Sequence, residues 1–300
     1  MKITCLLILA QLIFLATFCQ EKPQLLYPDG VPNSKPTPDT YVEKDNTPGR
    51  RGFVSIPTIT PYLVKNGTAT GTGVIIFPGG GYSILAIDKE GDSIARAFNQ
   101  IGINAFVIKY RLPSDEIMID KTIGPLQDAQ QAILTVRQNA ATWGIKAGRV
   151  GIIGFSAGVH LASTAGTHLS RSFVAKGDSV SIRPDFMILM YPVISLESFA
   201  HVGSRDKLLG KNATADKIKE FSNDKQVTSR TPPTFIVHAT DDNVVPVQNS
   251  ILFYQALLAA GVPAEMHIYQ AGGHGFGLNN PKATDKWFDR CAGWLKENGF

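Results

Sequence analysis

The second half of the chain carries residue types that together perform nucleophilic catalysis. Ser156 stands in the run GFSAG at 154–158, which fits the pattern G-x-S-x-G. An aspartate pair, Asp241 and Asp242, and then His274 among glycines follow it along the chain. Because a serine hydroxyl needs an adjacent base, and that base needs a carboxylate to orient it, this order predicts an acyl-transfer site. We expect Ser156 to be the nucleophile, His274 the base and one of the two aspartates the acid.

The setting of Ser156 favours this interpretation over an ordinary glycine-rich turn with an N-capping serine. An apolar run at 150–155 precedes the serine and a helical pattern follows it, so Ser156 lies at a strand-to-helix turn. The flanking glycines and Ala157 permit the tight backbone that such a turn requires. The turn also places the hydroxyl at the positive end of a helix, where developing negative charge is stabilised.

A glycine run, PGGGY at 78–82, offers backbone N–H donors for the oxyanion of an acyl-transfer reaction. It follows an early apolar strand, as an oxyanion loop should. We expect the oxyanion hole to consist of the N–H groups of Gly80, Gly81 and Ala157. A phosphate-binding loop is the alternative, but no Lys-Ser/Thr ending follows the glycines.

Other polar residues near these motifs are expected around the site. Tyr82 and Glu90 come soon after the glycine run, and His160 lies one turn into the helix that carries the serine. These three are candidate substrate contacts. Arg111 and Asp128 are expected to form a pair that braces a loop beside the site, with direct substrate contact as the alternative.

The elements that position these residues alternate between apolar strands and helices. The alternation predicts an α/β fold with a mostly parallel central sheet and helices on both faces. Such sheets bind ligands at the carboxyl ends of their strands, which is where the motifs lie. A polar stretch at 195–230 is expected to be mostly irregular and to shape the pocket. The predicted strands are 59–64, 74–77, 103–110, 150–155, 186–191, 235–239 and 264–269, and the predicted helices are 88–101, 125–143, one that opens after Ser156, 247–260 and 284–297.

The composition is that of an ordinary globular protein. The chain has 300 residues, 44% hydrophobic and 18% charged, which is enough to bury one large core. A formal charge of +4 is too mild to indicate nucleic acid as a partner, and no basic cluster with interleaved aromatics occurs. Neither H-E-x-x-H nor a paired-cysteine motif is present, so we expect no metal and no cofactor. The sequence does not determine the oligomeric state.

The N-terminus differs in kind from the rest. Met1 and Lys2 precede an almost uninterrupted apolar run at 3–18, which is short for a membrane-spanning helix of about 20 residues. The pattern predicts a signal peptide over 1–19 and an exported protein, periplasmic or secreted, without a stable membrane span after cleavage. An uncleaved anchor is the alternative. Lipidation at Cys19 is a further one, but Phe18 stands where a lipoprotein signal has a small residue.

Two parts follow this signal peptide. Residues 20–51, rich in Pro, Asp, Asn and Lys, are expected to form an extended arm over the domain without regular structure. Residues 52–300 are expected to form the catalytic domain. Cys291 is then the one cysteine of the mature chain, so no internal disulfide can form, and we expect it to be packed in a C-terminal helix.

Taken together, these motifs resemble the esterase and lipase branch of the α/β-hydrolase superfamily. More closely, the chain is similar to exported bacterial proteins described as acetyl-xylan esterase, xylanase-like or dienelactone-hydrolase-like. The resemblance covers about residues 52–300. It is carried by PGGGY at 78–82, KEG at 89–91, KYRLP at 109–113, PLQDAQQA at 125–132, GFSAG at 154–158, HLA at 160–162, VHATDDNVVPVQNS at 237–250 and GGHGFGL at 272–278.

This resemblance implies the α/β-hydrolase fold and a serine esterase that removes acetyl groups from a polysaccharide or oligosaccharide such as xylan. Its substrate would be an acylated carbohydrate. The resemblance favours Asp242 as the acid, because Asp242 stands four residues before Pro246, like the usual acid of the superfamily. Pro78 is a departure, since it replaces the histidine of the HGGG motif of lipases and so removes one anchoring side chain.

Other functions share part of the pattern. A peptidase of the prolyl-oligopeptidase type has the same triad, but such enzymes usually carry a propeller domain for which 300 residues leave no room. A non-catalytic carbohydrate-binding protein is the other alternative, and it would be expected to lack a triad residue. Glycoside hydrolysis uses two carboxylates that flank the scissile bond, and no Asp or Glu pair follows the strands in that way.

Overall fold

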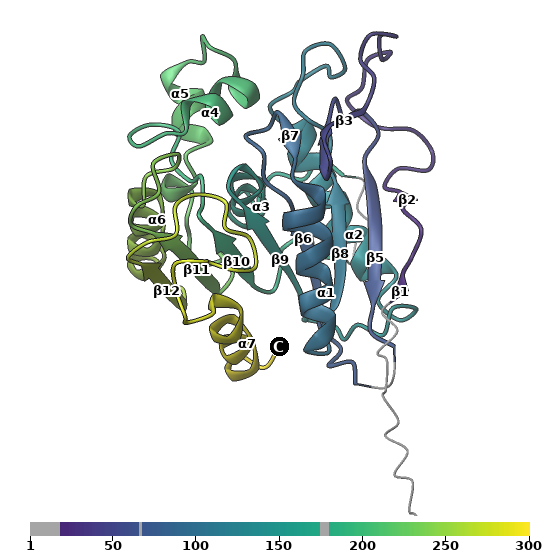
Figure 1. Ribbon diagram of the computed structural model, residues 1–300. Coiled ribbons are helices and arrows are strands. Elements are labelled where there is room, and N and C mark those ends of the chain that lie inside the picture. Colours follow the sequence, from purple (N-terminus) through teal and green to yellow (C-terminus); the bar gives the residue numbers. More distant parts are fainter. Residues whose placement is uncertain (1–18, 66–67, 175–179) are drawn as a thin grey trace, which may run out of the picture.

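A mostly parallel sheet runs through the centre of the molecule (Figure 1), as predicted. The computed structural model of the chain describes residues 19–65, 68–174 and 180–300. Neighbouring strands from β8 to β12 are parallel, whereas β5 is antiparallel to β8, β1 and β2. The order is β1 (Cys19–Gln20), β5 (Thr58–Leu63), β8 (Asn104–Lys109), β6 (Gly73–Phe77), β9 (Val150–Phe155), β10 (Met187–Met190), β11 (Thr234–Ala239) and β12 (Ala264–Tyr269), with β2 (Gln24–Leu25) also paired to β5.

Helices cover both faces of this sheet (Figure 1). Side chains of α1 and α7 pack in one core cluster with Val74 and Ile76, whereas those of α2, α3 and α6 pack in the other with Ile75 and Phe77. These four residues are consecutive in β6, so alternate side chains of the strand point to opposite faces. The helices are α1 (Ser93–Gln100), α2 (Gly124–Gln138), α3 (Ala157–Thr167), α6 (Gln248–Ala259) and α7 (Trp287–Glu297).

The central strands have uninterrupted apolar sequences because they are buried on both faces. Every residue of β6, β9, β10 and β11 is buried, whereas β12 is a partly exposed edge strand. The predicted helix at 88–101 begins with one turn of π-helix, Asp88–Asp92, and continues as α1. The predicted helix at 125–143 ends earlier, at Gln138.

The C-terminal helix α7 packs on the sheet through Trp287 and Cys291. Cys291 is fully buried and forms no disulfide, and burial raises the pKa of its thiol. It is therefore packed rather than reactive, as predicted. Neither α7 nor any other helix in the described part of the chain is long and apolar enough to cross a membrane.

The arm before residue 52 contains regular structure, so the prediction of an irregular arm is wrong. Besides β1 and β2 it forms a hairpin, whose second strand pairs with β7 near the glycine loop. Pairing with partners distant in sequence supplies hydrogen bonds that a polar segment does not reveal by itself. The predicted signal peptide lies outside the described residues, apart from Cys19, which pairs with Leu63. The hairpin consists of β3 (Lys44–Thr47) and β4 (Arg50–Gly52), and β7 is Ile84–Leu85.

The polar stretch at 195–230 is also more regular than expected. Its two helices begin with side-chain caps, in which His201 and Thr214 accept hydrogen bonds from backbone N–H groups. The helices bury few side chains, so the apolar periodicity that reveals longer helices is weak here. They are α4 (Val202–Leu209) and α5 (Ala215–Glu220), followed by a turn of 3-10 helix at Asn223–Lys225.

Candidate active site

Ser156 lies at the sharp turn between β9 and α3. Its φ of 51° and ψ of −118° are strained values for a residue other than glycine. The Ser156 N–H donates to Met190 O at 3.0 Å, which ties the turn to the neighbouring strand. A Cβ at Gly158 would lie only 2.2 Å from Phe77 O, so glycine is required there by close backbone approach. The local sequence therefore fixes the serine at the carboxyl end of β9.

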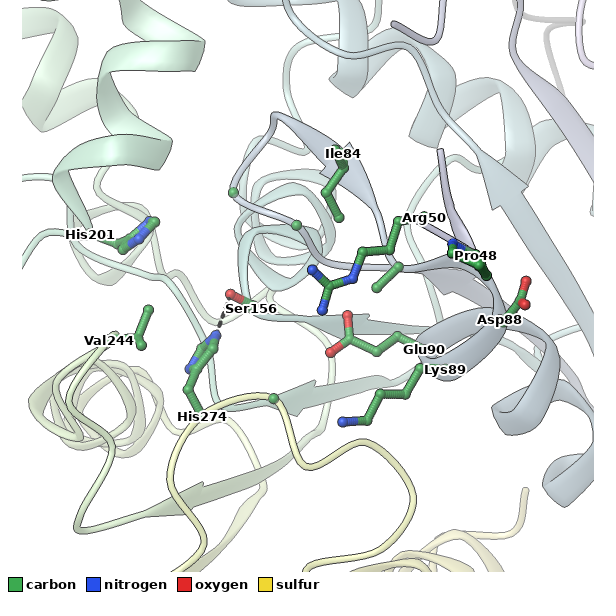
Figure 2. A pocket seen from close by; sticks show the side chains of 15 residues that line it. Pro48, Arg50, Ile84, Asp88, Lys89, Glu90, Ser156, His201, Val244 and His274 are labelled. Atoms are coloured by element: carbon green, nitrogen blue, oxygen red, sulfur yellow. Dashed lines mark hydrogen bonds between the residues drawn. The ribbon is translucent and has the colours of Figure 1, made fainter. Parts of the chain in front are cut away.

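His274, on the loop after β12, bridges the serine and an acid. Its Nε2 lies 2.8 Å from Ser156 Oγ, and its Nδ1 lies 2.7 Å from Asp242 Oδ2. When Nδ1–H donates to the carboxylate, Nε2 is free to accept the serine proton. Three residues taken from separate motifs thus form one hydrogen-bonded row, of which Figure 2 shows the contact between Ser156 and His274.

Asp242 is held by several groups besides His274. Its Oδ1 accepts hydrogen bonds from the N–H groups of Val244 and Val245, each at 2.9 Å. Its Oδ2 lies 3.1 Å from His238 Nε2. Burial by itself raises the pKa of Asp242, but the hydrogen bonds from two histidines and a backbone amide outweigh it and hold the pKa well below its usual range. The group is therefore a carboxylate at neutral pH, suited to stabilise a cationic imidazole.

Asp241, the alternative acid, occupies a different position. Its Oδ1 accepts hydrogen bonds from the N–H groups of Gly272 and Gly273, both at 2.8 Å. These glycines directly precede His274, so Asp241 fixes the loop that carries the histidine. The geometry thus selects Asp242 as the partner of the imidazole ring.

The glycine loop after β6 has two anchors. Gly79 N–H donates to Glu90 Oε2 at 2.8 Å, and Pro78 O accepts from Tyr110 Oη–H at 2.7 Å. Tyr110 thus anchors a loop that lacks the histidine of the HGGG motif.

The next two glycines of this loop line the pocket with Ser156. Gly80 has a φ of 135°, and a Cβ there would lie 2.1 Å from Ile84 O, so only glycine fits. In the described residues, no hydrogen bond uses the N–H of Gly80 or Gly81. These two amides, with that of Ala157 at the start of α3, are the donors available for an oxyanion.

A buried network links the glycine loop to the histidine loop. Glu90, whose other oxygen holds Gly79, accepts a hydrogen bond at Oε1 from Tyr191 Oη–H at 2.8 Å. The same hydroxyl accepts from Gly277 N–H at 3.1 Å, and the Tyr191 ring packs edge-on to His274 with centroids 5.1 Å apart. Burial raises the pKa of Glu90. No sequence motif includes Tyr191, although its place directly after β10 is a signal that could have found it.

Tyr82 and His160, expected as substrate contacts, lie behind the pocket. Tyr82 Oη and His160 Nδ1 are 3.0 Å apart, and His160 Nε2 lies 2.8 Å from Phe221 O. Burial lowers the pKa of His160 to about 4, so its ring is neutral at physiological pH. Neither residue lines the pocket at the serine, so this geometry does not agree with the expected contacts. Glu90 does line the pocket, but its two oxygens belong to the network above.

The pocket in front of Ser156 has a volume of about 700 Å³ and is built from segments far apart in sequence. Arg50 comes from the arm hairpin, His201 from the turn before α4 and Val244 from the loop after β11 (Figure 2). Sequence reasoning missed all three: Arg50 and His201 belong to no motif, and Val244 was considered only as part of the run that carries the aspartates. The described side chains include no group of three or more His, Cys, Asp or Glu residues placed to hold a metal ion. The lining residues are Pro48, Gly49, Arg50, Gly80, Gly81, Ile84, Ala86, Asp88, Lys89, Glu90, Ser156, His201, Val244, His274 and Gly275.

Arg111 and Asp128 form a fully buried ion pair, with Arg111 Nη2 at 2.7 Å from Asp128 Oδ1. Arg111 Nη1 also donates to Pro32 O at 2.7 Å and lies 3.3 Å from Ser34 Oγ. The pair is not part of the pocket lining. The predicted pair is thus confirmed, but the segment that it braces is the N-terminal arm and not the expected loop beside the site.

Comparisons with known proteins agree with this arrangement. The family model BD-FAE matches residues 61–257, and the Dienelactone hydrolase family model matches residues 222–298. The acetylxylan esterase of Xylanibacter ruminicola is 39% identical over 76% of this chain and 46% of its own length. The endo-1,4-beta-xylanase B of Butyrivibrio fibrisolvens is 34% identical over 77% of this chain and 36% of its own length.

The chain therefore spans less than half the length of both curated relatives. A solved structure matches it more completely. The acetyl ester-xyloside bifunctional hydrolase from Caldicellulosiruptor lactoaceticus is 38% identical, with a TM-score of 0.79 over 93% of this chain and 97% of the other. By sequence and by structure, the chain belongs to the BD-FAE family and has the α/β-hydrolase fold.

Proposed function

We propose that the protein is a serine esterase that removes acetyl groups from xylan or xylo-oligosaccharides. The observation that carries this proposal is the hydrogen-bonded row of Ser156, His274 and Asp242, which opens into a pocket beside unpaired glycine amides. Every component of acyl transfer is present in this arrangement: a nucleophile, a base, an orienting carboxylate and oxyanion donors.

The reaction proceeds in two halves. Ser156 Oγ attacks the ester carbonyl while His274 Nε2 takes its proton, and the oxyanion is held by the N–H groups of Gly80, Gly81 and Ala157. The tetrahedral intermediate collapses when His274 gives the proton to the leaving sugar oxygen, which leaves the acetyl group on the serine. Water then attacks this acyl-enzyme, with His274 again as base, and releases acetate. Throughout, the carboxylate of Asp242 stabilises the imidazolium.

The choice of substrate draws support from the relatives. One of the proteins described above is named an acetylxylan esterase, and another, which matches over nearly its full length, is named an acetyl ester-xyloside bifunctional hydrolase. A glycosidase mechanism has less support from the pocket. The described pocket lining contains two carboxylates, Asp88 and Glu90, and glycoside hydrolysis needs two that act on the substrate. Glu90 already accepts hydrogen bonds from Gly79 and Tyr191.

The test is hydrolysis of p-nitrophenyl acetate, butyrate and octanoate, with acetate release from acetylated xylan measured in parallel. We expect activity on acetate and on acetylated xylan that falls by at least about a thousandfold in Ser156→Ala. Ser172→Ala removes an exposed serine remote from the pocket and is the matched control. Activity on no ester, or activity that survives Ser156→Ala, would contradict the proposal and favour a carbohydrate-binding role. Cleavage of peptide substrates in place of esters would favour a serine peptidase.

We also propose that the protein is exported through cleavage after Cys19. The basic start and the short apolar run support this. Mass spectrometry of the protein recovered from the periplasm and the medium of a bacterial host tests it. A mature chain that begins at Gln20 is expected, whereas an intact N-terminus in the membrane fraction, or a lipid-modified Cys19, would contradict it.

A further inference from the structure

The N-terminal arm is fixed to the body of the protein on its way to the pocket. Arg111 holds it through Pro32 O, and Asn33 exchanges hydrogen bonds with the backbone of Asp120 at 2.7 and 2.8 Å. Such contacts, made partly by a buried charged group, hold a segment in one conformation. The hairpin that follows in the arm is therefore presented to the pocket by an anchored chain.

This hairpin forms one wall of the pocket. Its strand β4 pairs with β7, which directly follows the glycine loop, and Asp88 N–H donates to Gly49 O at 3.3 Å. Arg51 forms an ion pair with Asp45 at 2.7 Å within the hairpin and does not line the pocket. Its neighbour Arg50 does line it. Two adjacent arginines thus have different environments.

The guanidinium of Arg50 points into the pocket toward Ser156 (Figure 2). No carboxylate of the described chain forms an ion pair with it, and no hydrogen bond of its side chain occurs there. In Figure 2 the carboxylate of Asp88 lies on the other side of Pro48 and faces away from Arg50. Figure 2 shows the carboxylate of Glu90 nearer to Arg50, but its two oxygens accept hydrogen bonds from Gly79 N–H and Tyr191 Oη–H. Among the described residues, the hairpin therefore presents a guanidinium that no carboxylate pairs.

A guanidinium offers a planar fork of N–H donors that matches a carboxylate, and such bidentate pairs are among the strongest hydrogen bonds in proteins. We propose that Arg50 binds a carboxylate carried by the substrate, so that the enzyme prefers acidic esters. This inference rests on the proposed ester hydrolysis at Ser156. The carboxylate could belong to the alcohol, as a uronic acid substituent beside the acetylated sugar, or to the acyl group, as in the half ester of a dicarboxylic acid.

The experiment compares kcat/KM for two pairs of esters. One pair is an acetylated xylo-oligosaccharide with and without a glucuronic acid substituent, and the other is mono-p-nitrophenyl succinate and p-nitrophenyl acetate. In one of these pairs the acidic ester carries the carboxylate that Arg50 binds. For that pair, we expect Arg50→Gln to lower the ratio of kcat/KM for the acidic ester to kcat/KM for the neutral ester about tenfold. Arg50→Lys, which keeps the charge but not the fork, should restore part of the ratio. Arg51→Gln removes the same charge one residue away and should leave the ratio unchanged.

Two outcomes would overturn the inference. The ratio could be the same in Arg50→Gln as in the unchanged protein; if both sugar esters were then slowed equally, Arg50 would contact sugar hydroxyls instead. The ratio could also fall equally in Arg51→Gln, which would indicate only long-range charge. The pair of substrates whose ratio changes identifies whether the carboxylate lies in the alcohol or in the acyl part.

A binding measurement separates this inference from the proposed function. Calorimetric titration of Ser156→Ala with the glucuronic-acid-substituted xylo-oligosaccharide, its neutral counterpart and succinate requires no hydrolysis. We expect an acidic ligand to bind at least about tenfold more tightly when Arg50 is present than in Ser156→Ala with Arg50→Gln. Equal affinities would overturn the inference even in an active esterase. An Arg50-dependent preference without hydrolysis of any ester would instead contradict the proposed function and leave Arg50 as a carboxylate-binding group.

Discussion

The two sides of the pocket are built in different ways. On one side, Ser156, Asp242 and His274 each follow a strand of the parallel sheet, and short motifs rich in glycine or aspartate place them. The rest of the lining includes Arg50, from a hairpin of the arm, and His201, from the turn before α4, and the sequences of these segments show no motif. The reacting side therefore depends on local backbone geometry, and the facing side depends on contacts between distant segments.

This difference suggests a division of labour between chemistry and selectivity. Catalytic groups must meet at fixed distances, which the carboxyl ends of adjacent parallel strands supply. The facing wall needs only a fixed position relative to the sheet. The buried pair of Arg111 and Asp128 holds the arm in such a position. Changes on the first side should act on turnover, and changes on the second side should act on stability and substrate choice.

The largest expected effect distinguishes the two adjacent aspartates on the reacting side. Asp242→Asn should lower kcat by about 10⁴-fold, because the imidazole loses its orienting carboxylate. Asp241→Asn should lower kcat by less than about tenfold, since an asparagine oxygen still accepts the hydrogen bonds of Gly272 and Gly273. Steady-state kinetics on p-nitrophenyl acetate checks both. The reverse order of the two effects would assign the acid to Asp241.

The next effect concerns stability on the facing side. Arg111→Met leaves Asp128 buried without its partner and should lower the free energy of unfolding by about 3–5 kcal/mol. Arg290→Met breaks an exposed pair with Asp285 and should change it by less than about 1 kcal/mol. Urea denaturation of both variants provides the measurement. Equal unfolding free energies of the two variants would mean that the buried pair does not stabilise the arm.

A pH effect should separate His160 from the reacting groups. Burial lowers the pKa of His160 to about 4, so the folded protein binds fewer protons than the unfolded chain at intermediate pH. Its stabilising contribution is complete above the unfolded pKa of about 6.5 and is lost as the pH falls toward 4, a change of about 3 kcal/mol. His160→Gln should lower the slope of the unfolding free energy against pH over this range by about half, because burial also lowers the pKa of His168 to about 4 and that residue remains. If the slope of the unfolding free energy against pH is the same in His160→Gln, another group causes the pH dependence.

The smallest expected effect lies in the network between the two loops of the reacting side. Tyr191→Phe removes the hydroxyl that donates to Glu90 and accepts from Gly277. It should lower kcat by about tenfold with little change in KM, since the oxyanion and histidine loops lose their common partner. Tyr254→Phe, on α6, is the control and should have no effect. A rise in KM alone would indicate that Tyr191 instead contacts the substrate.

The agreement between sequence and structure follows the same division. The predicted strands at 74–77, 150–155 and 235–239 match β6, β9 and β11 within a residue, because strands buried on both faces require continuous apolar runs. The short strands of the arm and the helices α4 and α5 were not predicted. β1, β2 and β4 pair with strands distant in sequence, β3 pairs within a short polar hairpin, and the apolar faces of α4 and α5 are too short to show a period.

The sequence by itself determined which serine, which histidine and which glycine loop would meet, because a strained serine turn and a close backbone approach tolerate very few residues. The two aspartates lie on the same loop, and only the resemblance to known hydrolases favoured Asp242. The tertiary structure decided between them, by placing Asp242 at the imidazole and Asp241 at the backbone of the histidine loop. It alone also brought Arg50 to the pocket and buried His160 behind it, because those positions depend on packing between segments that no local pattern encodes.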